Sequence, residues 1–212
     1  RTDVWRPAIV QALKIIMENN FFIFGDTTWH QLDGTAMGTS CAPPFASLYL
    51  AYFEERILPT FQQHVRYYKR FIDDILIIWN PRTLQYAHKA FIAKMTQTSK
   101  LKFTHNTFNT EAPFMDLWVI KTATTYTTRT HQKQLNLYLY LPANSAHAPG
   151  VLKGIIVGLL KKYKFQNPNP RDFKQIAELF FQRLLDRGYN PLTLKRLFTQ
   201  ALKVQAEAKP TP

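Results

Sequence analysis

The chain has 212 residues, of which 46% are hydrophobic, so it can bury the core of one large domain or of a domain with a smaller helical partner. Its formal net charge of +13 favours a polyanionic partner such as nucleic acid, although simple solubility charge is the alternative. The single cysteine excludes an internal disulfide and a cysteine-based zinc cluster, and the six histidines show no metal-ligand spacing. No apolar run reaches the ~18 residues of a membrane span, so we expect no membrane partner.

The first part of the chain alternates helical and strand-like patterns. Apolar residues at helical spacing, with Pro7 in the first turn, predict a helix, and Gly25-Asp26 lies between two strand-like runs. The predicted elements are a helix capped by Thr2 or Asp3 and ending near Asn19, a hairpin of Phe21–Phe24 and Thr27–Leu32, and a helix from Pro43 or Pro44 to about Ile57.

The segment from Val65 to Trp79 is the most informative part of the sequence. Two β-prone runs flank the adjacent carboxylates of Asp73 and Asp74. Asp is a poor strand residue and a good turn residue. The pattern therefore predicts a β-hairpin with both carboxylates at its tip.

The remaining residues predict a change from mixed structure to helices. An amphipathic helix from Pro81 to about Lys100 precedes expected short strands at 101–108, 114–121, 126–130 and 135–141. After Pro142 the sequence reads as helices at about 149–164, 171–187 and 191–206, with a break at Gly188–Pro191. This order indicates an α+β layer over residues 1–142, a helical subdomain over 143–206 and a frayed tail at 207–212.

Asp73 and Asp74 are the strongest candidates for chemistry. Adjacent carboxylates repel each other unless a cation neutralises them, and hard cations such as Mg²⁺ prefer carboxylate oxygens. An isolated Asp-Asp pair is more often a solvated turn. Flanking hydrophobic strands favour a metal site, because they hold the pair rigidly.

A second block runs from Gly34 through Met37-Gly38 to Pro43-Pro44 and Leu50. Glycines before a helix allow a ligand to approach the backbone, and the helix N-terminus favours an anion such as a triphosphate. By itself the block is more often an ordinary loop-to-helix entry.

Together, and in this order, the two blocks resemble those of reverse transcriptases. Tyr68–Asp74 looks like the family's aromatic-x-Asp-Asp hairpin, with Phe71 as the aromatic residue, and Met37–Leu50 looks like the loop-helix block beside the incoming nucleotide. Phe114–Leu117, Leu137–Pro142 and Ser145–His147 are similar to downstream segments of Penelope-like and related eukaryotic retroelement enzymes. The resemblance covers most of residues 15–200.

The resemblance implies a reverse-transcriptase-like palm, an antiparallel sheet with helices, followed by an all-α thumb-like bundle. Asp73 and Asp74 would then be catalytic and bind Mg²⁺, and Met37, Gly38 and Phe71 would lie at the nucleotide. The thumb would grip RNA or an RNA–DNA duplex through four lysines of its first helix: Lys153, Lys161, Lys162 and Lys164. From the residues alone, a solvated helix face explains these lysines equally well.

In that family a further Asp lies on a palm strand upstream of the first helix. Asp3 is the only acidic residue close by, and its position favours a helix N-cap over a catalytic ligand. The start at Arg1, without an initiator Met or signal-peptide pattern, suggests a processed chain or a fragment. We therefore expect Mg²⁺ binding and catalysis only if another strand completes the site.

Two functions stay open. The first is an RNA-directed DNA polymerase, of which this chain is the palm and thumb portion. The second is a non-catalytic, reverse-transcriptase-derived RNA-binding subunit of a ribonucleoprotein, for example an organellar ribosome. Both imply other protein chains as partners and an intracellular location, in the nucleus or the mitochondrion.

Overall fold

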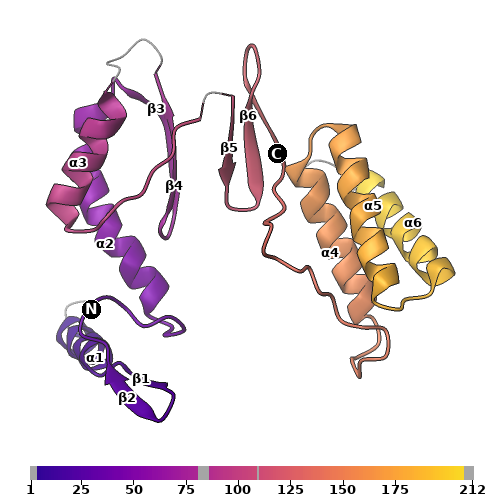
Figure 1. The fold of residues 1–212 in the computed structure, drawn as a ribbon, viewed down its shortest axis with the longest axis horizontal. Coiled ribbons are helices and arrows are strands. Elements are labelled where there is room, and N and C mark those ends of the chain that lie inside the picture. The colour runs from indigo at the N-terminus through magenta and orange to yellow at the C-terminus, as the bar shows by residue number, and fades with distance from the viewer. Residues whose placement is uncertain (1–3, 81–85, 109, 208–212) are drawn as a thin grey trace. The chain divides into compact units, whose positions relative to one another are not determined.

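The fold combines α-helices with small antiparallel sheets. It is known from a computed structural model that describes residues 4–80, 86–108 and 110–207. The described residues form six α-helices, two two-stranded sheets and one three-stranded sheet, which confirms a mixed α+β class (Figure 1). The chain divides into two compact units, residues 1–105 and 106–212.

The first unit carries both blocks of the sequence resemblance. Its elements are α1 (Arg6–Glu18), β1 (Phe21–Phe24), β2 (Thr27–His30), α2 (Ala42–Ile57), the 3₁₀ helix η1 (Leu58–Phe61), β3 (Val65–Phe71), β4 (Asp74–Trp79) and α3 (Ala87–Ser99). The core of this unit forms where α2 and α3 meet one face of the β3–β4 hairpin. Its buried residues are Leu50, Ile57, Phe91 and Met95, with Tyr68, Ile77 and Trp79 packed against them.

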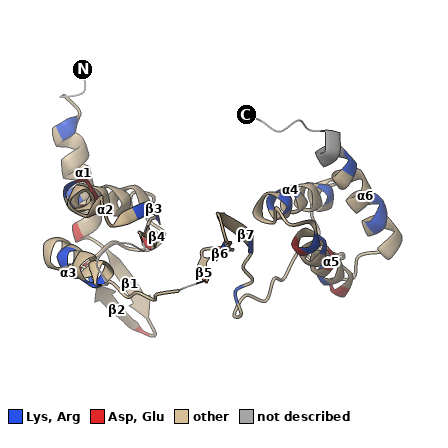
Figure 2. Ribbon diagram, turned by 90° about the horizontal axis from the view of Figure 1, so that it is seen from above, with Lys and Arg blue, Asp and Glu red and all other residues tan. Residues whose placement is uncertain are grey.

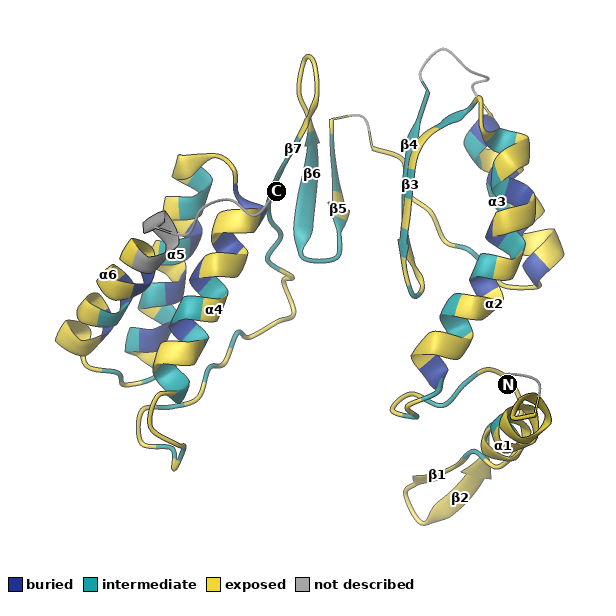
Figure 3. Ribbon diagram, turned by 180° about the vertical axis from the view of Figure 1, so that it is seen from behind, coloured by how far each residue is buried: buried dark blue, intermediate teal, exposed yellow. Residues whose placement is uncertain are grey.

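Helix α1 and the β1–β2 hairpin differ from the rest of the unit in their exposure. No residue of α1 is buried, and every residue of β1 and β2 is exposed (Figure 3). Phe21 and Phe24 leave 61% and 74% of their surfaces in solvent. The apolar pattern that predicted these elements therefore does not produce a core within the described residues.

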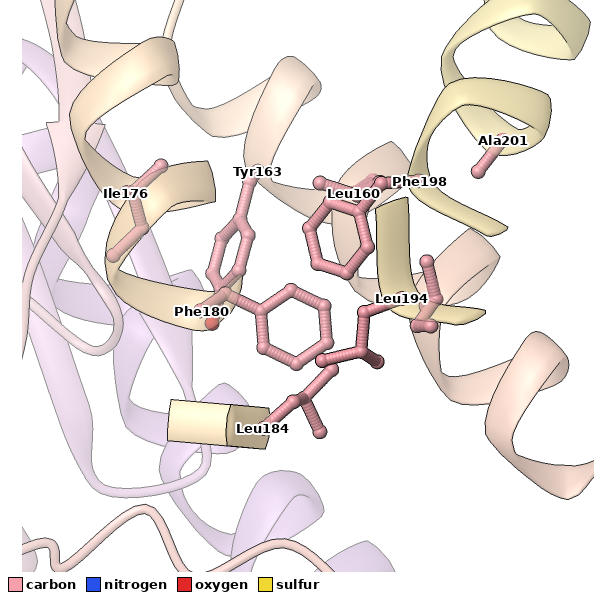
Figure 4. Close-up of a cluster of buried hydrophobic side chains, with 9 residues drawn as sticks. Leu160, Tyr163, Ile176, Phe180, Leu184, Leu194, Phe198 and Ala201 are labelled. Atoms are coloured by element: carbon pink, nitrogen blue, oxygen red, sulfur yellow. The ribbon is translucent and has the colours of Figure 1, made fainter. Parts of the chain in front are cut away.

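The second unit packs a sheet against a three-helix bundle. Its elements are β5 (Glu111–Phe114), β6 (Leu117–Lys121), β7 (Tyr126–Thr130), α4 (Val151–Gln166), α5 (Pro170–Asp186) and α6 (Pro191–Glu207). The buried core comes from all three helices and includes Leu160, Phe180 and Leu194 (Figure 4). The Thr130 amide donates to Asn167 Oδ1 at 2.9 Å, which attaches β7 to the end of α4.

Most predicted elements are confirmed, and three expectations differ from the structure. Residues 101–108 form no strand, because no neighbouring strand pairs with them. The expected strand 114–121 is instead the end of β5, a turn at Met115-Asp116, and β6. Residues 135–141 form no strand either, because Tyr138 has a φ of 49° and hydrogen-bonds locally to Asn136.

Parts of three predicted elements lie outside the described residues. Thr2 and Asp3, which were expected as helix caps, are among the residues that the structure does not describe, and the described helix α1 begins after Trp5 without a side-chain cap. The expected start of the third helix at Pro81 also lies outside them, as do residues 208–212 of the expected tail.

The boundary between compact units lies between residues 105 and 106, whereas composition suggested residue 143. This difference arises from tertiary hydrogen bonds between the sheet and the helices. Thr128 Oγ1 donates to the Gln166 carbonyl, and Asn167 Nδ2 donates to Thr130 Oγ1, so the β5–β7 sheet is joined to the helices that follow it.

Among the described helices, none combines the length and the apolar character that a membrane span requires.

Candidate functional site

The β3–β4 hairpin carries Asp73 and Asp74 at its tip. Phe71 pairs with Asp74, so the turn consists of Ile72 and Asp73 alone. Ile72 has a φ of 53°, which is rare for a β-branched residue. Both carboxylates are exposed. The predicted hairpin is therefore present, and its turn is strained at the residue before the carboxylates.

Arg70 holds this turn against helix α2. Its Nη1 donates to the Ile72 carbonyl at 3.0 Å, and its Nη2 donates to the Ser47 carbonyl of α2 at 3.0 Å. One guanidinium thus joins the strained turn to the helix that follows the glycine block. Because Arg70 is largely buried, these bonds are shielded from competing water.

Glu54 fixes the guanidinium in place. Arg70 Nε lies 2.5 Å from Glu54 Oε1, and Nη2 lies 3.0 Å from Oε2, which is a bidentate pair. The Tyr68 hydroxyl also donates to Glu54. Burial and this hydrogen bond raise the pKa of Tyr68 well above its usual range, and the bond to Glu54 raises the pKa of Arg70. The three side chains form one satisfied network beneath the turn.

A second hairpin in the chain has the same turn and provides an internal comparison. Phe114 pairs with Leu117 across Met115 and Asp116, and Met115 has a φ of 54°. There Asp116 is neutralised, because Lys162 Nζ lies 2.7 Å from its Oδ2. Within the described part of the chain, Asp73 and Asp74 have no such cation. Their charge is therefore available to a ligand.

The glycine block is open around its backbone. Gly38 has a φ of 94°, and a Cβ there would meet no atom within 4 Å. Met37 is fully exposed, and Phe71 is half-exposed on the face of β3 opposite to Arg70. Among the described residues no hydrogen bond or ion pair joins Met37 or Gly38 to the hairpin. The connection between the two blocks runs through Arg70 and Ser47 instead.

Figure 2 shows blue Lys or Arg positions on α4. The four predicted lysines of this helix are all exposed, but they are not equivalent. Lys162 is bound to Asp116, whereas no described carboxylate pairs with Lys153, Lys161 or Lys164. Gly154 and Gly158 are also exposed on this helix, with open space where a Cβ would lie. Part of α4 therefore presents, among the described residues, lysine side chains without an ion-pair partner next to glycines whose backbone no side chain covers.

Sequence reasoning missed Glu54 and the role of Arg70. The only signal was the two-residue spacing of Tyr68 and Arg70 in the predicted strand, which places both on one face. In the structure this face of β3 is the less exposed one. Nothing in the sequence indicated Glu54 as their partner.

The two Asp carboxylates fit part of a Mg²⁺ site. Oxygen ligands are what Mg²⁺ prefers, and it is usually bound by one or two carboxylates together with substrate phosphates and water. In the ranges that the structure describes, no group of three or more His, Cys, Asp or Glu could hold a metal ion. Asp3 lies outside those ranges.

Comparison with known proteins adds no relative: no protein-family model, curated protein or solved structure matches this chain.

Proposed function

We propose that the chain is the palm and thumb portion of an RNA-directed DNA polymerase that transfers nucleotides to a primer on an RNA template. The observation that carries this proposal is the pair of unneutralised carboxylates on a turn clamped by Arg70. A solvated surface turn does not require a buried Glu54–Arg70 pair beneath it. A site that binds a cation does require carboxylates held rigidly.

Asp73 and Asp74 would hold Mg²⁺ with the help of a further carboxylate from a strand outside these 212 residues. When bound, the metal supplies charge stabilisation at the attacking and leaving oxygens of a phosphoryl transfer. The chain's own residues support this role. Arg70 fixes the turn, and the open backbone at Gly38 leaves space for a nucleotide beside α2.

Helix α4 is the proposed contact with the template–primer duplex. Lys153, Lys161 and Lys164 lack carboxylate partners within the described ranges, so they are free to pair with phosphates. Gly154 and Gly158 leave the helix backbone open to close approach by a nucleic-acid strand.

The polymerase proposal is tested by a primer-extension assay with Mg²⁺ and an RNA template, in which the protein is purified from the cells that naturally produce it. We expect extension that Asp73→Asn reduces at least about 100-fold, because one of the proposed metal ligands loses its charge. Asp26→Asn is the matched control, since Asp26 also lies in a hairpin turn, between β1 and β2. Extension that survives Asp73→Asn contradicts the proposal.

A non-catalytic RNA-binding subunit of a ribonucleoprotein is the second candidate. The unpaired lysines and open glycines of α4 favour it, because they suit RNA whether or not the carboxylate site is complete. This function predicts stable co-purification with RNA and no primer extension.

Replacing Lys153, Lys161 and Lys164 together by Gln tests the role of α4 under both candidates. The slope of log Kd against log salt should fall by about one per lysine that contacts a phosphate. Lys174→Gln is the control, because Lys174 lies on α5 beside Glu178. An unchanged slope would mean that the α4 lysines are only a solvated face.

A further inference from the structure

The second unit contains an open depression between the end of β7 and the first turns of α5. Its volume is about 500 Å³. Trp118 of β6 and Arg129 of β7 line one side, and Asp172 and Gln175 of α5 line the other. Every lining residue belongs to this unit, so the depression is a property of one compact body.

The floor of the depression is rigid. Asn167 accepts from the Thr130 amide at 2.9 Å and donates to Thr130 Oγ1 at 2.7 Å. Thr130 Oγ1 also donates to Gln166 Oε1 at 2.9 Å, and Ile176 is buried alongside. These bonds hold β7 against the end of α4, from which α5 follows after a short connection, so this part of the depression is organised before any ligand arrives.

Asp172 is a half-buried carboxylate that no other group of the described chain uses. The first turn of α5 is capped by Asn169, whose Oδ1 accepts from the Arg171 amide, so Asp172 is not needed as the cap. It has no ion pair or hydrogen bond within the described residues. A carboxylate only accepts hydrogen bonds, so the groups it recognises are donors.

Some of the other polar groups around the depression have partners, since Arg129 Nη2 pairs with Glu111 at 3.1 Å and His131 Nδ1 lies 3.3 Å from the Met115 carbonyl. The side chains of Gln134 and Gln175 form no hydrogen bond within the described ranges. Gln132 Oε1 and Arg129 Nε are enclosed, and neither has a partner. Enclosed polar atoms without partners are rare in native proteins and point to a group that the chain itself does not supply.

An aromatic wall completes the arrangement. The Trp118 ring lies 4.8 Å from the His131 ring in an edge-to-face contact, and the Arg129 guanidinium lies 5.7 Å from the Trp118 ring. Flat ligands stack on aromatic rings and guanidinium planes while their edges form hydrogen bonds. An unpaired nucleobase has this combination of a flat face and a polar edge.

We propose that this depression binds an unpaired purine base, with guanine preferred. Guanine offers two adjacent donors, N1–H and the N2 amino group, to the oxygens of one carboxylate, and here that carboxylate is Asp172. The amides of Gln132, Gln134 and Gln175 supply further donors and acceptors to the base edge. Arg171, exposed beside Asp172, can offset the charge of a nearby phosphate.

The first test is titration with mononucleotides, followed by the NMR signal of the Trp118 indole N–H. Guanosine monophosphate should bind about ten-fold more tightly than inosine monophosphate, which lacks the N2 amino group, or adenosine monophosphate. Asp172→Asn should remove this preference. Glu178→Gln, a change of an exposed carboxylate on the same helix that does not line the depression, should preserve it.

Equal binding of guanosine and inosine monophosphates, or no change at Trp118, overturns the proposal. The proposal is also overturned if the Trp118 signal responds to an arginine-rich peptide and not to nucleotides, which would make the depression a cation site. A single-stranded guanosine-containing RNA that binds more tightly than the mononucleotide identifies a nucleic-acid strand as the source of the base. Equal affinity identifies the free nucleotide instead.

Guanine binding in this depression does not depend on the proposed polymerase site. Asp73→Asn should reduce primer extension as stated above and leave guanosine monophosphate binding unchanged, because Asp73 lies in the other unit. Loss of the guanine preference with Asp172→Asn, without loss of extension on a fixed template, keeps the two sites distinguishable.

Discussion

Arg70 satisfies its buried charge through Glu54, Ile72 and Ser47. Buried ion pairs contribute little net stability, because the cost of desolvation offsets their attraction. Their measurable effect is on geometry. Here the pair determines where the Asp73–Asp74 turn lies relative to α2, and an apolar pair of the same volume would not hold the two backbone carbonyls.

Replacing Glu54 by Gln should destabilise the first unit by about 3 kcal/mol, because the Arg70 charge stays buried without its partner. Chemical denaturation measures this change in the free energy of unfolding. Glu55→Gln is the matched control, since Glu55 is the exposed neighbour on the same helix. Equal effects of the two substitutions would contradict the role given to Glu54.

Tyr68 makes the first unit sensitive to alkaline pH. Burial, reinforced by Glu54, raises the pKa of its phenol in the folded state above the unfolded value of about 10. The stabilisation is therefore fully present below pH of about 10 and is lost as the pH rises towards the folded-state pKa. Tyr68→Phe should flatten this alkaline loss of stability, as followed by denaturation at a series of pH values. An unchanged pH dependence would exclude Tyr68 as its source.

At the scale of secondary-structure elements, the two tight hairpins share a Phe-aliphatic-Asp turn with an aliphatic residue at positive φ. In one, Lys162 neutralises Asp116; in the other, Asp73 and Asp74 stay free in the described chain. The same local geometry therefore serves two purposes. The two hairpins differ because helix α4 places Lys162 beside Asp116, whereas no described residue forms an ion pair with Asp73 or Asp74.

Ile72→Gly should stabilise the β3–β4 hairpin by about 1 kcal/mol, because glycine adopts positive φ without the steric cost of a β-branched side chain. Amide hydrogen exchange of β3 and β4 measures the change. Met115→Gly should act in the same direction on the β5–β6 hairpin. Ile78→Gly within β4 is the control and should destabilise. A loss of protection with Ile72→Gly would show that the turn is not strained.

At the scale of the whole molecule, the described residues form two cores of unequal size. The second unit buries side chains from α4, α5 and α6 around Phe180, whereas the first has a small core beneath β3 and β4. Helix α1 and the β1–β2 hairpin add exposed apolar residues to the first unit (Figure 3).

The two units should lose stability separately. Phe180→Ala should lower the free energy of unfolding of the second unit by about 4 kcal/mol, since it empties the centre of its core. Hydrogen exchange followed by mass spectrometry should show this loss over α4–α6 and unchanged protection of α2 and α3. Phe91→Ala is the reciprocal variant in the first unit. A parallel loss in both units would mean that they unfold as one.

The sequence by itself determined the local elements with strong patterns. Helical spacing located α2, α4, α5 and α6, and two β-prone runs around Asp73-Asp74 located the β3–β4 hairpin. These predictions succeed because the periodicity of side chains along a helix or strand is a local property. The same reasoning failed at Met115-Asp116, where a turn forms without Gly, Asn or Pro, and at 135–141, where alternating Leu residues suggested a strand.

Only the tertiary structure decided which charges are free and which are used. Arg70 and Glu54 are 16 residues apart, and Asp116 and Lys162 are 46 apart, so no local pattern announces either pair. The depression beside Asp172 likewise needs β6, β7 and α5 to meet. Whether a carboxylate is neutralised or available depends on distances between side chains far apart along the chain, and folding alone sets those distances.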